Sequence, residues 1–156
     1  MAELLHVSKI KVTREAGKGK GKTAFIEGFP EPIRTGLHGG VKRFYHVEGG
    51  IDLPTTLDHV VAALGSCLTG TLGSALEARS IPVGGEGVSA EVEGFIENVE
   101  NKPLITRVHV KYHFKVPKEK KAEAQKIVDS HEKYCAVSQS LRHGIAVELE
   151  AEIHES

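Results

Sequence analysis

One segment of the 156-residue chain constrains the fold more than any other, the apolar run from Thr56 to Ala78. Thr55, followed three residues later by Asp58, resembles a capping box with Asp where Glu or Gln is usual, so we expect a helix to begin here. Between Val60 and Leu72 the residues are apolar or small on every face. A helix that is hydrophobic all round is typical of a protein core, so we predict a long, buried central helix.

The residues before this helix show the alternation and the breaks of short strands. The pattern predicts four antiparallel strands, over residues 4–14, 23–27, 33–37 and 41–47. A glycine- and lysine-rich loop, residues 16–22, follows the first strand, and Gly21-Lys22-Thr23 ends like a phosphate-binding loop. Ala16, however, stands where that motif needs glycine, and a loop between two strands offers no helix N-terminus to a phosphate. We therefore expect no nucleotide binding there.

After the central helix the expected order is two strands, two helices and a last strand. These elements are expected over residues 87–99, 104–116, 118–130, 135–142 and 145–153. Strands and helices are grouped rather than alternating, with no internal repeat and no long linker between them. This order predicts one α+β domain over residues 1–156. The strand expected over residues 104–116 should be half-buried, with Ile105 on its polar face and an apolar face of Val108, Val110, Tyr112, Phe114 and Val116.

Charge and composition exclude several classes of function. Lys and Arg number 20 against 21 Asp and Glu, whereas proteins that bind nucleic acid carry a basic excess. We find no run of about 18 apolar residues, the length of a membrane span, and no basic and then apolar leader. The nine histidines follow no metal-ligand spacing. We expect a cytoplasmic protein that binds no nucleic acid, membrane or metal.

The chain has two cysteines, Cys67 in the middle of the long helix and Cys135 at the start of the last short one. Each could be a small buried residue, as free cysteines often are. Cys67 is far from the N-terminus of its own helix, so a reactive thiolate there needs a cationic side chain from elsewhere. Cys135 lies where backbone N–H groups can favour a thiolate. A thiol that reacts with peroxide commonly has a second thiol to trap its sulfenic acid.

Two segments carry a resemblance to a known family. Residues 55–76, TTLDHVVAALGSCLTGTLGSAL, resemble the central-helix motif of the OsmC/Ohr family of osmotically inducible and organic hydroperoxide resistance-like proteins. Residues 135–141, CAVSQSL, are similar to the second motif of that family, Cys-Pro-Val-Ser-x-x-Leu, with Ala136 in the usual place of proline. The resemblance covers most of the chain, and the first 50 residues match loosely.

The resemblance implies an OsmC-like α+β fold and an intertwined homodimer with its active sites at the subunit interface. It also implies a thiol-dependent peroxidase that reduces organic hydroperoxides in oxidative stress defence. By position, Cys67 would be the peroxidatic thiol and Cys135 the resolving one, with no bound cofactor or metal. An external dithiol, of lipoyl type in the family, would restore both thiols. Apolar residues around Cys67 would favour alkyl or lipid hydroperoxides over hydrogen peroxide.

Family members pair the reactive thiol with an arginine and with an acid that orients the arginine. Arg43, in the expected strand before the helix, is the closer match, with Arg34 as the second choice, and Asp58 matches the acid. Asp58 and Cys67 are about 13.5 Å apart along a helix and roughly 180° apart around it. Asp58 could therefore reach the thiol only through the arginine or from a partner subunit. Otherwise it caps the helix.

Other functions are open at this point. A non-enzymatic protein of the same fold would bind an apolar small molecule in an interface pocket, with both cysteines merely buried. Asp58 in the place of Glu, Ala136 in the place of proline and the glycine- and lysine-rich loop favour this alternative. A structural dimer without a ligand is a third hypothesis.

Overall fold

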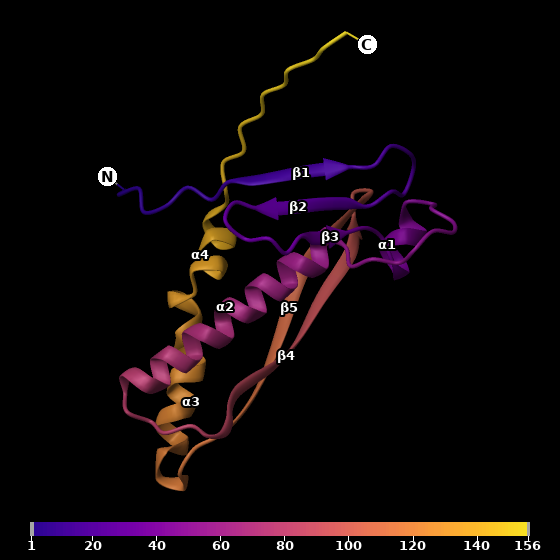
Figure 1. Ribbon diagram of the computed structural model, residues 1–156. Coiled ribbons are helices and arrows are strands. Elements are labelled where there is room, and N and C mark those ends of the chain that lie inside the picture. Colours follow the sequence, from indigo (N-terminus) through magenta and orange to yellow (C-terminus); the bar gives the residue numbers. More distant parts are fainter. Residues whose placement is uncertain (1, 156) are drawn as a thin grey trace. The chain divides into compact units, whose positions relative to one another are not determined.

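The computed structural model describes residues 2–155, and their contacts divide them into two compact units (Figure 1). The first unit holds residues 2–61 and 93–109, and the second holds residues 62–92 and 110–155. The long helix and one hairpin each contribute residues to both units. The prediction of a single domain over residues 1–156 stays a prediction.

The first unit contains a three-stranded antiparallel sheet. Its strands lie in the order β1 (Ile10–Arg14), β2 (Lys22–Ile26) and β3 (Ile33–Thr35). In the register of this sheet, Lys22 lies opposite Arg14 on one side and opposite Thr35 on the other. Three of the four strands predicted before the long helix are therefore confirmed, although β1 begins later than expected.

The fourth strand predicted there, over residues 41–47, is wrong. The chain forms the short helix α1 (Gly39–Phe44) instead. Val41 and Phe44 are both half-buried, and their spacing of three residues fits a helix rather than the period of two in a strand. The helical spacing outweighs the β-leaning composition of this segment.

The long helix, α2 (Thr56–Ala78), has the predicted bounds, but its burial differs from the prediction. The buried positions form a single stripe of Gly65, Leu68, Leu72 and Leu76. Val60 is 38% exposed. The expectation that every face of this helix is buried is therefore wrong for a single chain, and α2 keeps apolar surface outside the stripe.

By length and composition alone, α2 could also cross a membrane, with a mean hydropathy of 1.3 over an 18-residue window. The expectation that no segment is long and apolar enough to span a membrane is therefore corrected for α2. The core helix of a soluble protein passes the same test. Here the leucine stripe packs into the second unit, as the stripe of a core helix does.

The second unit has its core where the leucine stripe meets α3 (Lys121–Ser130). Leu72 and Leu76 are fully buried and cluster with Ile81, Ala124 and Ile127. Burying one leucine or isoleucine side chain contributes about 1.5–3 kcal/mol. This cluster therefore fixes which face of the C-terminal half of α2 is buried.

Two long strands, β4 (Gly84–Val99) and β5 (Lys102–Lys115), pair as the predicted hairpin. Both residues of the turn, Glu100 and Asn101, have positive φ angles of 50° and 61°. Positive φ at both positions is the type I′ geometry, which matches the twist of paired strands. Along β5 the exposed and half-buried residues alternate as predicted from Val108 onwards, whereas Ile105 is half-buried and not on the polar face.

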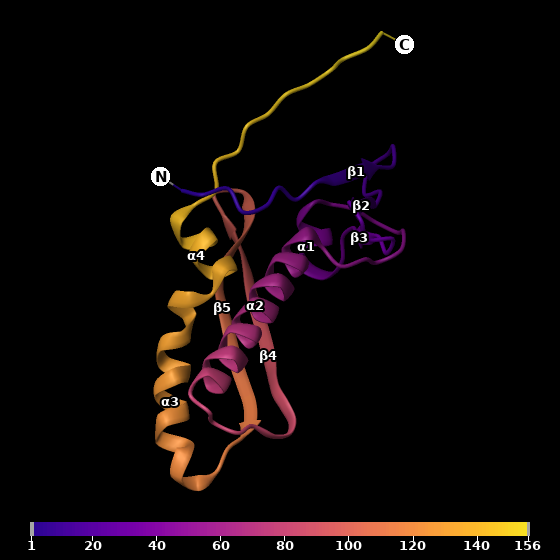
Figure 2. The same cartoon turned by 60° about the vertical axis from the view of Figure 1, so that its left-hand side comes forward.

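Helical segments follow the hairpin close to their predicted places. They are two 3-10 turns (Lys118–Lys120 and His131–Tyr134) on either side of α3, and then α4 (Ala136–His143). The last predicted strand, residues 145–153, is wrong for the single chain. Figure 2 shows these residues in an extended tail beyond α4, and no strand forms up to residue 155. A strand needs backbone partners, and the described residues of its own unit supply none.

Gly65 should be a position of α2 that tolerates no side chain. A Cβ at Gly65 would lie 2.6 Å from Cγ2 of Val92, whereas a Cβ at Gly73 would meet nothing within 4 Å. Alanine is better than glycine in a helix by up to about 1 kcal/mol, so Gly73→Ala should raise the free energy of unfolding. Gly65→Ala should lower it by about 1–3 kcal/mol, the effect of overpacking. Urea unfolding followed by circular dichroism measures both, and equal effects would contradict this packing.

Candidate active site

Two thiols meet in the second unit. Cys67 lies on α2 and Cys135 directly precedes α4, and the two side chains are close enough for each to shift the pKa of the other. Neither forms a disulfide. Cys135 is fully buried, whereas Cys67 is partly exposed. The fold therefore brings together two thiols that lie 68 positions apart in the sequence.

The start of α4 favours the thiolate form of Cys67. The backbone N–H of Val137 is the largest cause that lowers the pKa of this thiol, against the effect of burial. The Cys135 thiol, the N–H of Ala136 and the hydroxyl of Thr71 lower it further. The first N–H groups of a helix lack partners within the helix and carry partial positive charge. They favour the Cys67 thiolate independently of the cationic side chain that the sequence leads us to expect.

Cys135 has the opposite shift. Burial raises the pKa of its thiol, and the neighbouring Cys67 adds to the rise. The Cys135 sulfur is the N-cap of α4 and accepts a hydrogen bond from the backbone N–H of Ser138 at 3.4 Å. As expected, the N–H groups of Ser138 and Val137 act to lower the pKa of Cys135, but burial outweighs them and disfavours its thiolate.

Polar side chains surround this helix start. Glu132 accepts hydrogen bonds from Oγ of Ser138 and, at 2.7 Å, from Nε of Arg142, and both interactions lower the pKa of its carboxyl group. The hydroxyl of Tyr112 lies 2.8 Å from Nε2 of His131, and burial raises the pKa of Tyr112 to about 12. Sequence reasoning missed these contacts because they join residues of different elements.

A cavity of about 530 Å³ lies beside Cys67. Besides Cys67 it is lined by Gly70, Thr71, Ser74 and Ala75 of α2, and by Tyr134. The side chains that follow Cys67 on α2 are small, and the space they leave is large enough for a small organic molecule. Gly70, Thr71 and Ser74 could have been found from the sequence, because they follow Cys67 by three, four and seven residues on one helix face.

In the first unit, Asp58 caps α2. Its Oδ2 accepts hydrogen bonds from N and Oγ1 of Thr55 at 2.6 and 2.7 Å, and its own N–H donates to Thr55 Oγ1 at 3.1 Å. Nε2 of His38 lies 2.8 Å from the same Oδ2. Burial acts to raise the pKa of Asp58, but the hydrogen bonds from Thr55 and His38 lower it. The capping alternative is observed, and a role of Asp58 in orienting an arginine stays a prediction.

Both candidate arginines also belong to the first unit. Arg43 is an exposed residue of α1, in a helix and not in the strand expected from the sequence. Arg34 is an exposed residue of β3. The pairing of either guanidinium with the Cys67 thiolate stays a prediction that rests on the resemblance.

The thiol site thus joins Cys67 of the long helix α2 to the start of the short helix α4, where Cys135 is the N-cap. A comparison with protein families finds that residues 49–150 match the OsmC-like protein family. The chain belongs to the OsmC family. No curated protein matches its sequence.

Solved structures of OsmC-like proteins share this fold. An OsmC-like protein from Vibrio cholerae has a TM-score of 0.68 and 17% identity, over 87% of this chain and 94% of that one. An organic hydroperoxide resistance protein OsmC from Legionella pneumophila has a TM-score of 0.60 and 18% identity, over 90% and 92%. The organic hydroperoxide resistance protein OhrB of Bacillus subtilis has a TM-score of 0.56 and 15% identity, over 91% and 96%. The predicted OsmC-like α+β fold is confirmed.

The opposite pKa shifts of the two thiols predict different alkylation profiles. In Cys135→Ser, the rate at which Cys67 reacts with iodoacetamide should rise with pH through an inflection below about 8.5, the value of an ordinary thiol. In Cys67→Ser, Cys135 should inflect above that value because burial disfavours its thiolate. Intact mass measured across a pH series follows both reactions. Inflections in the reverse order would contradict this assignment.

Proposed function

We propose that this OsmC-family protein is a thiol-dependent peroxidase that reduces organic hydroperoxides in oxidative stress defence. The observation that carries the proposal is the contact between two thiols with opposite pKa shifts, lowered at Cys67 and raised at Cys135. A peroxide-reacting thiol must be available as a thiolate, and a second thiol must lie beside it to trap the sulfenic acid. The names of the Legionella and Bacillus proteins, organic hydroperoxide resistance proteins, agree with this reaction.

In the proposed reaction the Cys67 thiolate attacks the distal oxygen of the hydroperoxide. The O–O bond breaks, the alkoxide takes a proton and leaves as the alcohol, and Cys67 becomes a sulfenic acid. The Cys135 thiol then attacks the Cys67 sulfur, an S–S bond forms, and the sulfenic oxygen leaves as water. An external dithiol, which we propose to be of lipoyl type, reduces this disulfide and is itself oxidised to a disulfide. The thiolate is the nucleophile, so the step needs no metal or bound cofactor.

The cavity beside Cys67 supports a substrate with an organic body. Ala75 and the ring of Tyr134 offer it apolar contacts, and the small residues Gly70 and Ser74 leave room for it. We therefore propose alkyl or lipid hydroperoxides as substrates. A reducing compartment, which we propose to be the cytoplasm, keeps both thiols reduced between turnovers.

Cumene hydroperoxide tests this reaction directly. Reduced protein treated with it should lose two hydrogens in intact mass together with both titratable thiols, because a disulfide forms. Cys135→Ser should instead gain one oxygen and react with dimedone, which labels sulfenic acids. Cys67→Ser should do neither. Unchanged thiols in the wild-type protein would overturn the peroxidase proposal and favour the alternative, binding of an apolar small molecule.

The same assay separates the two arginines, and Arg43→Gln and Arg34→Gln are a matched pair for it. We propose that Arg43 favours the thiolate and that Asp58 orients it. A nearby guanidinium lowers an acidic pKa by about 1–3 units, so at neutral pH Arg43→Gln should slow oxidation about tenfold or more. Arg34→Gln should keep the wild-type rate, and the reverse result would move the role to Arg34.

We further propose that the protein is an intertwined homodimer. Leu5, Leu149 and Ile153 are 87%, 92% and 92% exposed in the single chain. In the tail, residues 145–153, apolar residues alternate with polar ones as in a strand that buries one face. A second copy of the chain can supply both the paired backbone and the apolar surface that such a segment needs.

Light scattering after size-exclusion chromatography tests the dimer. The wild-type protein should have about twice the chain mass of 16.8 kDa. Leu149→Asp should shift the population towards the monomer, because it places a charge on the apolar face of the tail. Glu150→Lys changes a charge at the next position, on the opposite face of an extended segment, and should leave the dimer intact. A monomeric wild-type protein would contradict the proposal.

A further inference from the structure

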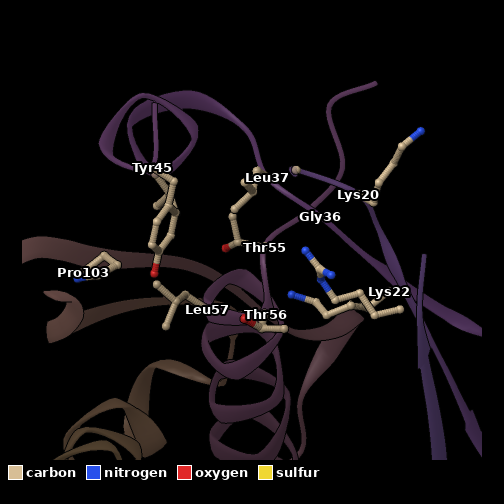
Figure 3. A pocket seen from close by; sticks show the side chains of 12 residues that line it. Lys20, Lys22, Gly36, Leu37, Tyr45, Thr55, Thr56, Leu57 and Pro103 are labelled. Carbon is tan, nitrogen blue, oxygen red and sulfur yellow. The ribbon is translucent and has the colours of Figure 1, made fainter. Parts of the chain in front are cut away.

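We propose that the first unit binds a small organic anion in a cavity at the start of α2. This cavity has a volume of about 420 Å³, and Arg14, Lys20 and Lys22 line it (Figure 3). They come from β1, from the glycine- and lysine-rich loop and from β2. Among the described residues that line the cavity, none carries a carboxylate. The anion site shares no residue with the thiol site, and the proposed function does not use it.

These three cationic side chains lack a partner of opposite charge. Within the described part of the first unit none of them forms an ion pair, whereas Nζ of Lys42 lies 2.7 Å from Oδ1 of Asp52. Arg14 donates to the carbonyl of Gly17 at 3.0 Å. Cations around one cavity repel each other, and an anion bound between them would turn this repulsion into attraction.

The start of α2 adds neutral donors to the cavity. The capping box satisfies the N–H groups of Thr55 and Asp58. Thr56 and Leu57 also line the cavity, and within the described part of the unit no acceptor is found for their N–H groups, as is usual in the first turn of a helix. Such first-turn N–H groups bind anionic oxygens well. Figure 3 shows the side chain of Lys22 extending towards Thr56, in the first turn of α2.

Tight contacts of glycine hold the cationic loop against the unit. Gly19 has a φ of +71°, and a Cβ there would lie 2.5 Å from Cγ1 of Val47. The backbone N–H of Glu15 donates to the carbonyl of Gly21 at 3.3 Å. Figure 3 shows Lys20 pointing away from Lys22. We therefore infer that Arg14 and Lys22 contact the bound anion, whereas Lys20 attracts it through its charge without direct contact.

The remaining wall decides the class of ligand. Besides the donors, two glycines and Thr55, the wall includes the larger side chains of Leu37, Val41, Leu57, Pro103 and Tyr45. These residues offer apolar contacts and one phenol to the body of a ligand. The cavity therefore fits a compact apolar or aromatic molecule with one phosphate or carboxylate group.

The sequence could not reveal this site. From the sequence, the glycine- and lysine-rich loop is not expected to bind phosphate, because it joins two strands and no helix follows it. The structure supplies a helix N-terminus to the cavity from a later part of the chain, at Thr56 and Leu57. The contact is tertiary, and no spacing within the loop encodes it.

Isothermal titration calorimetry of the full chain with phenyl phosphate, benzoate and inorganic phosphate tests the proposal. Phenyl phosphate or benzoate should bind saturably at one site per chain, and the tighter of the two identifies the anionic group. Inorganic phosphate should bind more weakly because it lacks the apolar body. Lys22→Gln and Arg14→Gln should each weaken binding about tenfold, the effect of losing one charged hydrogen bond.

Lys18→Gln is the matched control, because it removes the same charge from the same loop at a residue that does not line the cavity. It should bind as the wild-type protein does. Equal weakening by Lys18→Gln, or no saturable binding of any probe, would overturn the proposal. Cys67→Ser should bind the anion unchanged, so this result is independent of the peroxidase test. Unfolding midpoints of all variants confirm that they are folded.

Discussion

The packing of Leu68, Leu72 and Leu76 into the second unit fixes the rotation of α2, and the chemistry of the thiol site depends on that rotation. Residues three or four apart share one side of a helix, so the buried stripe also determines where Cys67 and Thr71 point. With the stripe in the core, Cys67 meets the first turn of α4. The same cysteine at another phase of the helix would be only a small apolar residue.

The pKa values of the two thiols shift in opposite directions because the sulfurs lie differently at the N-terminus of α4. Cys67 approaches α4 from outside and receives the N–H groups of Ala136 and Val137. Cys135 is the N-cap of α4 and is fully buried, so burial outweighs the effect of the N–H groups of Ser138 and Val137 on its pKa. Backbone N–H groups and neighbouring side chains thus lower the pKa of one thiol, whereas burial raises the pKa of the other.

Local patterns predicted the elements that local forces determine. The bounds of α2 follow from the capping box of Thr55 and Asp58, and the hairpin follows from alternation around a turn. The strand predicted over residues 41–47 is wrong because the helical spacing of Val41 and Phe44 outweighs its composition. The strand predicted over residues 145–153 is wrong for the single chain because a strand needs a neighbouring strand. The resemblance selected Cys67 and Cys135, but the donors from α4 could not be predicted because they belong to a distant segment. Arg43 and Asp58 lie in the other unit.

The place of Cys135 as N-cap of α4 couples bonding at its sulfur to the order of the helix. The Cys135 sulfur accepts the N–H of Ser138 in the first turn of α4, and the same atom would form the new bond in a disulfide or another modification. Good N-cap residues stabilise a helix by about 1 kcal/mol, so a change at this atom acts on the first turn of α4. That turn carries the N–H groups that favour the Cys67 thiolate. In the proposed reaction, the disulfide at Cys135 would therefore act on the same first turn of α4 that favours the Cys67 thiolate.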